Sequence, residues 1–424
     1  MPRLFSITLA FFFFAGCRTP REVATARGPR DNFIATLLHS YPNYFDSLLQ
    51  NQDQYGIQVI YTQIDRNKHG KPILTDHFFN VNNNYFYPAS TVKLPVALLA
   101  LEKLNRLHIR ELDRNTMMIT EAEYPGQTSV YNDPTSADGR PTVAQYIKKI
   151  FLVSDNDAFN RLYEFLGQEY INKQLHRMGH TDAEIIHRLN ITLSEDENRH
   201  TNPVNFYSHN RDDTVTAIIY VKPSQNSQWM YAKRDDKKGI GYYAGDKLIN
   251  EPFDFSKKNR LSLTDLHSIL KSVFFPQDLK RKQRFKLKKE DVSFVCKYMS
   301  MFPRESTYPS YDSSYQDAYS KFILWGEGKE EQDGHIRIFH KSGAAYGFLT
   351  DVCYVVDFKN NIEFMLSATI HCNSDGIYND DHYDYETIGL PFLKNLGKVF
   401  YDYELKRERR YKPDLSASKP DYGK

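Results

Sequence analysis

The order of strand-like and helix-like segments is the feature that most constrains the fold of this chain. Residues 56–66, GIQVIYTQIDR, have the β-branched and aromatic content of a strand. Near the other end, HIRIFHKSG, FLTDVCYVVDF and NIEFMLSATIHC are three strand runs with short connections, typical of an antiparallel meander. Most segments between them repeat apolar residues at helical spacing. We therefore predict an α+β fold, with one antiparallel sheet built from both chain ends and an all-helical subdomain between them.

The helices are predicted from apolar periodicity and from their stop signals. A first helix is expected over residues 32–49, and another begins at Ser90. Glycines at 167 and 179 end two further helices, DAFNRLYEFLG and EYINKQLHRMG. Residues 107–140 read as irregular, and the remaining helices are TVAQYIKKIFL, LSLTDLHSILKSVFF, KEDVSFVCKYMSMF and IGLPFLKNLGKVFYDYEL.

Residues 200–258 differ in character and are predicted to form a β-rich insertion. TVTAIIYVKP and QWMYAKRD flank SQNS, a pattern typical of a β-hairpin. The insertion carries four large aromatic residues, which would either line a substrate cleft or form a small core of the insertion itself. They are Trp229, Tyr231, Tyr242 and Tyr243.

The first 31 residues predict export and anchoring. MPRLFSITLAFFFFAGC has a basic residue, a short apolar run and small residues, as a secretory signal does. Its ending, FAGC, resembles a bacterial lipobox, which implies lipidation of Cys17; the alternative is an ordinary signal peptide cut nearby. Residues 18–31 read as a tether, 32–402 as the main domain and 403–424 as a charged tail. We expect an extracytoplasmic protein in the periplasm or outer membrane.

Composition excludes several classes of protein. The formal net charge is +2 over 424 residues, which gives no electrostatic argument for a nucleic-acid partner. Aromatic residues make up 14%, enough for a large core. Cys353 and Cys372 could pair or remain free, like Cys296. No histidine or cysteine cluster has metal-ligand spacing, so we expect no metal and no organic cofactor.

Three short motifs, in one order, carry the chemistry. Ser90-Thr-Val-Lys93 stands at a helix start, so its serine and lysine share one helix face. The triplet 154–156, SDN, lies between two helices, and the triplet 341–343, KSG, ends a strand run. S-x-x-K also occurs at residues 268–271 and 416–419, but only the first copy is followed by the other two motifs. Singly, each motif reads equally as a helix cap or a turn.

Together the motifs resemble those of serine β-lactamases and penicillin-binding proteins, and most closely the class A β-lactamase-like serine hydrolases. The resemblance covers roughly residues 32–402, interrupted by the insertion. It implies the β-lactamase/transpeptidase-like fold and an acyl-enzyme mechanism without a cofactor.

The same resemblance implies a role for each motif residue. Ser90 is the nucleophile and Lys93 its base, which must be neutral to accept a proton. Ser154 relays a proton to the leaving nitrogen. Substrate binding falls to Asn156, Lys341, Ser342 and Ala344, and the backbone N–H groups of Ala344 and Ser90 stabilise the oxyanion.

One family element is missing. Class A enzymes use a glutamate within E-x-x-L-N to activate the water that releases the acyl group, and this chain has no such pattern. Glu195, Asp196 and Glu197 are in the wrong frame and read more simply as solvated acids. Three functions therefore stay open: a β-lactam hydrolase, a D-alanyl-D-alanine peptidase acting on peptidoglycan stem peptides, and a non-hydrolysing penicillin-sensing or cell-wall-binding lipoprotein.

Overall fold

The structure is a computed structural model that describes residues 32–81, 84–209, 215–416 and 419–422. These residues belong to one compact unit, Asn32–Lys424. The predicted signal, the lipobox with Cys17 and the tether lie outside the described residues. No helix in the described part of the chain is long and apolar enough to cross a membrane.

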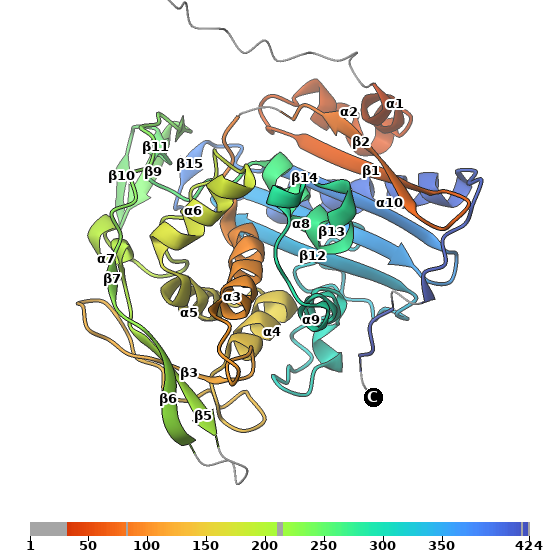
Figure 1. The fold of residues 1–424 in the computed structure, drawn as a ribbon. Helices are drawn as coiled ribbons and strands as arrows, with labels where there is room; N and C mark the ends of the chain where they lie inside the picture. Colours follow the sequence, from red (N-terminus) through yellow and green to blue (C-terminus); the bar gives the residue numbers. More distant parts are fainter. Residues whose placement is uncertain (1–31, 82–83, 210–214, 417–418, 423–424) are drawn as a thin grey trace, which may run out of the picture. The chain divides into compact units, whose positions relative to one another are not determined.

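Five strands form the antiparallel sheet that the sequence predicts, and they come from both ends of the chain (Figure 1). In spatial order the sheet runs β12-β13-β14-β1-β2. Strands β1 and β14 lie side by side, with Val59 opposite Ala368, so this pair joins the two ends of the chain. The strands are β1 (Gln58–Arg66), β2 (Pro72–Phe79), β12 (Ile336–Ala345), β13 (Phe348–Asp357) and β14 (Ile362–His371).

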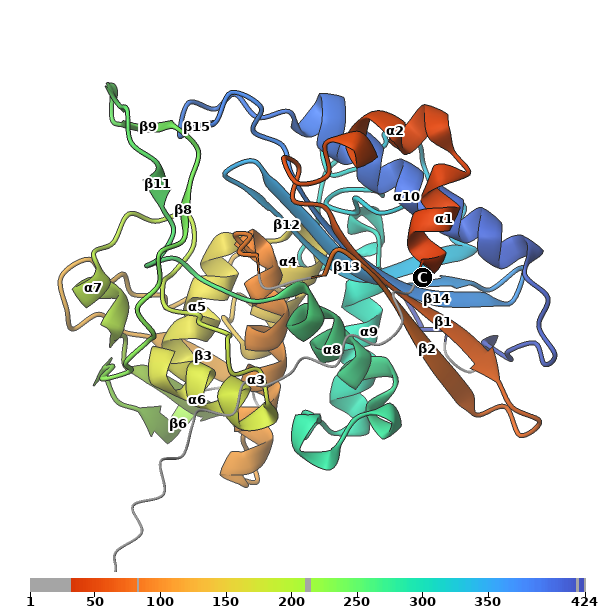
Figure 2. The same cartoon turned by 90° about the horizontal axis from the view of Figure 1, so that it is seen from above.

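Helices cover both faces of this sheet (Figure 2). One face packs against α1 (Phe33–His39), α2 (Pro42–Gln50) and α10 (Leu390–Lys406) through a hydrophobic core of its own. The other face packs against the helical subdomain, whose core is continuous with the apolar side chains of α3 (Lys93–Leu107). Nearly every side chain of α3 is buried, so α3 is the central helix of the subdomain.

The helical subdomain follows the predicted boundaries closely. Thr142 and Ser262 cap α4 and α8 by accepting hydrogen bonds from the backbone N–H groups of Gln145 and Asp265. Gly179, at φ +105°, ends α6 in the left-handed conformation that glycine tolerates. The helices are α4 (Val143–Val153), α5 (Asn156–Leu166), α6 (Gln168–Met178), α7 (Glu195–Arg199), α8 (Leu263–Phe274) and α9 (Lys289–Ser300).

Two predictions of secondary structure are wrong. The expected helix over 32–49 is two helices, because Pro42 has no N–H to donate and starts α2 instead of continuing α1. The expected hairpin around SQNS does not form: β6 (Val215–Lys222) pairs with the preceding strand β5 (Val204–His209), and residues 228–236 are not a strand. That stretch is held by side chains, since Trp229 Nε1 donates to Glu184 at 2.9 Å and Arg234 to Asp182 at 2.9 Å.

The insertion is built from short strands in small sheets, which Figure 1 draws in green. Its β5 pairs with β6 on one side and, on the other, with β3, a strand in the region predicted to be irregular. The strands of the insertion are β4 (His200–Thr201), β5 (Val204–His209), β6 (Val215–Lys222), β7 (Gln225–Asn226), β8 (Lys237–Lys238), β9 (Gly241–Ala244), β10 (Lys247–Ile249) and β11 (Phe253–Asp254). Two strands outside the insertion pair with it, β3 (Met117–Thr120) and β15 (Ile377–Tyr378).

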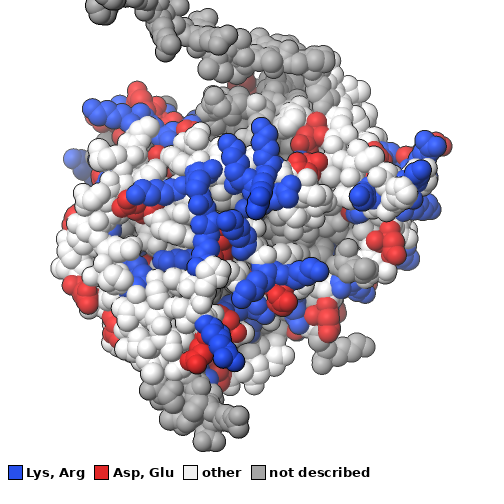
Figure 3. Space-filling view, viewed as in Figure 1, with Lys and Arg blue, Asp and Glu red and all other residues white. Residues whose placement is uncertain are grey.

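Charge is uneven although the net charge is small. Residues 280–289 contain seven lysines and arginines and no acid, and most of them are exposed. Phe285 and Leu287 within this segment pack against the core, so the cations project outward. Figure 3 shows lysines and arginines gathered on the face that carries α6 and the α8–α9 connection.

A buried ionic cluster ties α10 to β1. Glu404 is fully buried and accepts hydrogen bonds from the Tyr61 hydroxyl, from Arg409 and, at 3.0 Å, from Arg407 Nε. Arg407 also donates to Asp65 at 2.5 Å. A carboxylate in this position is tolerable only while its cationic partners remain in place.

We predict that Glu404→Ala lowers the free energy of unfolding by about 3–5 kcal/mol, because it leaves Arg407 and Arg409 without their shared acceptor. Urea denaturation measures this loss. Glu408→Ala, at an exposed position four residues on, should change stability by less than about 0.5 kcal/mol. Equal midpoints for the two variants would contradict the role given to the cluster.

Candidate active site

Ser90 lies in a single turn of 3-10 helix, Ala89–Val92, that leads directly into α3. Ala89 has φ +44°, a conformation that alanine rarely adopts, and it directs the chain into this turn. Thr91 fixes the turn: its N–H donates to the oxygen of Pro88 at 3.0 Å, and its hydroxyl does so at 2.6 Å. Ser90 is half-buried and lines a cavity of about 640 Å³.

The edge strand β12 passes directly against this turn. A Cβ atom at Gly343 would lie 2.7 Å from both the Pro88 oxygen and the Ser90 nitrogen, so only glycine permits this approach. The triplet 341–343 lies within β12, which runs on to Ala345, rather than at a strand end as predicted. The third motif is thereby brought against the first, although roughly 250 residues separate them in the chain.

Lys93 joins the first motif to the second. Its side chain is fully buried, and Nζ donates to the Ser154 backbone oxygen at 2.5 Å, to Asn156 Oδ1 at 2.7 Å and to Ser154 Oγ at 3.2 Å. Burial lowers the pKa of Lys93 well below its usual value, and the Lys341 ammonium lowers it further, while Asp155 opposes the shift. The pKa of Lys93 is thus shifted in the direction that a general base requires.

Lys341 completes the contact among the three motifs. Its Nζ donates to Ser154 Oγ at 2.9 Å and to the Ser342 oxygen at 2.7 Å. Burial lowers the pKa of Lys341 to about 7, and Lys321 adds to the effect, although Asp351 opposes it. The Ser154 hydroxyl thus lies between two lysines whose affinity for a proton is reduced, a geometry suited to proton transfer.

Local backbone structure places Ser154 between them. Ser154 ends α4 in the left-handed conformation, at φ 58°, and Asp155 then caps α5 by accepting from the Ala158 N–H at 2.8 Å. Asn156 opens α5 and lines the Ser90 cavity.

The other two predicted binding residues differ in position. Ala344 is exposed and lines the cavity on the edge strand, which has backbone groups facing away from β13. The Ser342 side chain is buried, and its hydroxyl donates to the Ser320 oxygen at 2.5 Å instead of lining the cavity. In this conformation the Ser342 hydroxyl proton is used in a hydrogen bond within the protein.

The wall near Asn156 comes from the segment that precedes α7. Leu189 lines the cavity, and its backbone is clamped by Asn160, which donates to the Leu189 oxygen at 3.0 Å and accepts from its N–H at 2.9 Å. Asn160 lies one helical turn after Asn156 on α5. The sequence analysis did not identify Leu189 as a residue that lines the cavity. Asn160, which binds the Leu189 backbone, was the signal available in the sequence.

The acids considered for water activation are engaged elsewhere. Glu195 binds Tyr231 and Lys257, Asp196 accepts from the Tyr124 hydroxyl at 2.5 Å, and Glu197 closes a capping box with Ser194. None of the three lines the Ser90 cavity. Among the described residues that line it, Asp381 is the one carboxylic acid.

The insertion aromatics do not line the cavity either. Trp229 packs on His176, Tyr231 lies under Arg199, and Tyr242 packs on Phe253 at 5.3 Å between ring centroids. Of the two interpretations, these contacts favour packing within and beneath the insertion. The three cysteines among the described residues are free thiols: Cys353 and Cys372 are buried and unpaired, and Cys296 is partly buried.

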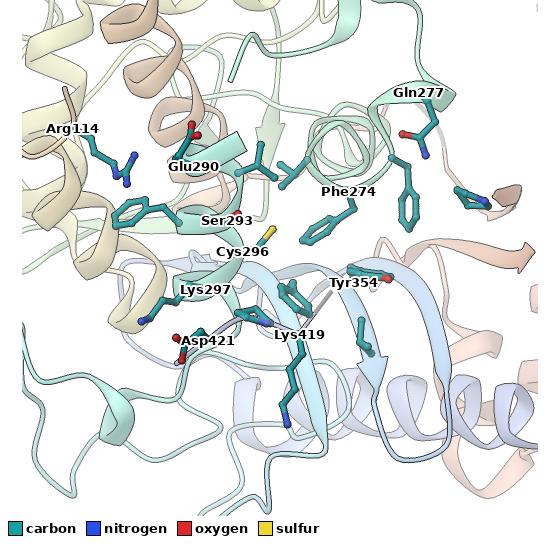
Figure 4. Close-up of a pocket in the computed structure, with 18 of the residues that line it drawn as sticks. Arg114, Phe274, Gln277, Glu290, Ser293, Cys296, Lys297, Tyr354, Lys419 and Asp421 are labelled. Carbon is teal, nitrogen blue, oxygen red and sulfur yellow. The ribbon is translucent and has the colours of Figure 1, made fainter. Parts of the chain in front are cut away.

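A second cavity, of about 720 Å³, contains none of the motif residues. It lies between α8, α9 and the sheet, with Phe274, Tyr354 and Cys296 on its walls and Lys297 at its edge (Figure 4). The candidate active site is therefore assigned from the convergence of the motifs and not from cavity size.

With this geometry established, comparison with known proteins gives one family match. The model of the β-lactamase enzyme family matches residues 46–225, a segment that carries Ser90, Lys93 and the triplet 154–156. The comparison with curated proteins gives no match. The resemblance to β-lactamases that the motifs predict is confirmed, and so is the β-lactamase/transpeptidase-like fold with its antiparallel sheet and helical subdomain.

Three solved structures illustrate how distant the similar proteins are. A class A β-lactamase from Clostridium kluyveri is 13% identical, with 85% of this chain and 98% of that chain covered and a TM-score of 0.44. A β-lactamase from Xanthomonas campestris is 12% identical over 88% and 98%, with a TM-score of 0.46. A PBP-A variant in an acyl-enzyme complex with penicillin G is 14% identical over 86% and 96%, with a TM-score of 0.43.

The depressed pKa of Lys341 predicts how stability depends on pH. Between pH 7 and the pKa of an unfolded lysine, about 10.4, the unfolded state binds more protons than the folded state. Stability should therefore rise with pH in this window, by up to about 1.4 kcal/mol per pH unit from this group. Lys341→Met should make the rise shallower across pH 7.5–9.5, as measured by urea denaturation.

Lys286→Met, which removes an exposed lysine, is the matched control and should leave the slope as in the wild type. A slope that Lys341→Met does not change would show that Lys341 is protonated throughout this range.

Proposed function

We propose that this protein is a serine hydrolase that is acylated at Ser90 by a β-lactam or a related amide. The observation that carries the proposal is the convergence of Lys93, which follows Ser90 by three residues, and Lys341 on the Ser154 hydroxyl. A structural lysine gains nothing from burial beside a second lysine, whereas a catalytic base needs the lowered pKa.

The residues support a balanced acylation step. Neutral Lys93 accepts the proton of the Ser90 hydroxyl as the Ser90 oxygen bonds to the substrate carbonyl carbon. Backbone N–H groups of Ser90 and Ala344 hold the resulting oxyanion. Ser154 then gives its proton to the amide nitrogen as the C–N bond breaks, and Ser154 regains a proton from the lysines.

The release step decides between this function and its nearest alternative. The acyl group leaves when water attacks, and the chain lacks the E-x-x-L-N glutamate that activates this water in class A enzymes. This observation favours a D-alanyl-D-alanine peptidase, a penicillin-binding protein acting on peptidoglycan, as the second candidate, because a β-lactam would then remain on Ser90. A protein that only senses penicillin or binds the cell wall would leave a peptide substrate uncleaved.

We predict that the purified soluble domain gains the mass of a penicillin on mixing, as followed by intact mass spectrometry, and that Ser90→Ala gains none. Ser268→Ala, in the second S-x-x-K on α8, should acylate like the wild type. A transient adduct with accumulating penicilloic acid identifies a β-lactamase, and a persistent adduct identifies the peptidase class. Acylation that survives in Ser90→Ala would exclude Ser90 as the nucleophile.

We also propose an extracytoplasmic location with a lipid on Cys17, supported by the FAGC ending of the apolar N-terminal run. The expected result is that labelled palmitate is incorporated into the wild type and that Cys17→Ser abolishes it. Label retained in that variant would place the lipid elsewhere and remove the assignment of the lipobox.

A further inference from the structure

The Ser90 cavity carries one charged group that neither the fold nor the proposed chemistry explains. Two cationic side chains line it, Arg188 and Lys258. Arg188 is buried and satisfied: it donates to Glu164 at 2.9 Å, to the Glu197 oxygen at 3.1 Å and to the His200 oxygen at 3.0 Å. Among the described residues, Lys258 pairs with no carboxylate.

Aromatic rings hold the Lys258 ammonium in place. Its Nζ lies 5.7 Å from the ring centroid of Tyr346 and 5.8 Å from that of Phe253, distances typical of cation–π contacts. These two rings stack on each other at 5.5 Å. Tyr346 also lines the cavity and follows Ala344 by two residues, so Lys258 lies on the oxyanion side of the site.

The backbone beside Lys258 is rigid. Residue 184, which lies before the insertion, bridges to residue 260, which lies just after it, with N···O distances of 2.8 and 2.7 Å. Asn259 is fully buried and accepts hydrogen bonds from the N–H groups of Ile186, at 2.8 Å, and His187, at 3.1 Å. The insertion is therefore closed at its base directly beside the cavity, and this closure fixes the position of Lys258.

We infer that Lys258 and Tyr346 form a subsite for a carboxylate on the acyl portion of the substrate. A half-buried ammonium without a counterion is best satisfied by an anionic ligand. In the proposed mechanism the leaving group receives its proton from Ser154, which does not line this cavity. The acyl part of the substrate, which remains bonded to Ser90, therefore occupies the space in front of the Lys258 side chain. The substrate class is an amide whose acyl side bears a negative charge.

This inference rests on the proposed function, and the test separates the two. Carbenicillin and benzylpenicillin differ by one carboxylate on the acyl side chain, and their second-order rates of acylation can be measured by intact mass spectrometry. For Lys258→Met, the rate with carbenicillin should fall about tenfold and the rate with benzylpenicillin should change by less than about twofold. Lys258→Arg should keep the preference for the charged penicillin.

Two further variants sharpen the result. Lys257→Met removes the neighbouring lysine, which pairs with Glu195 at 3.0 Å and does not line the cavity, and should leave both rates unchanged. Asp381→Asn removes the one acid that lines the cavity and should raise the rate with carbenicillin alone.

Equal losses with both penicillins in Lys258→Met would show a structural role and overturn the inference, as would no loss with either. If both penicillins acylate Ser90 of the wild type, the proposed function stands whatever Lys258 does. If neither penicillin acylates the wild type, both the proposed function and the proposed subsite are wrong.

Discussion

Two buried lysines that share one serine hydroxyl are the interaction on which the site depends. Lys93 and Lys341 come from a helix and from an edge strand, and both donate to Ser154 Oγ. Burial lowers the pKa of both lysines, and the nearby Lys341 ammonium lowers the pKa of Lys93 further. The proposed role of Lys93 as the base for Ser90 accounts for the retention of this energetic cost of burial.

The close approach of backbone segments makes that geometry possible. Gly343 lets β12 lie against the Ser90 turn without a side chain between them, and the left-handed residue Ser154 turns the chain from α4 into α5. Each is positioned by a sheet whose strands β1 and β14 come from opposite ends of the chain, and Glu404 clamps α10 to this sheet.

The insertion contributes to the wall of the Ser90 cavity and does not contribute to the three motifs. Its base is closed beside the cavity by Asn259 and by the bridge between residues 184 and 260. Through that closure it contributes Lys258, while Leu189, on the segment before α7, lines the same cavity. Lys93 and Lys341 therefore come from α3 and the edge strand β12, whereas Lys258 comes from the insertion.

The sequence alone determined the order of elements, the sheet built from both chain ends and the three motifs, because periodicity, caps and short motifs are local properties. It also predicted that Lys93 and Lys341 meet, through a resemblance and not through any local signal. Only the tertiary structure decided that the Ser342 hydroxyl faces Ser320, that the acids at 195–197 are engaged elsewhere, and that Leu189 and Lys258 line the cavity. These facts depend on contacts between segments far apart in the chain, and on the conformation of an insertion whose strand pairing the local pattern mispredicted.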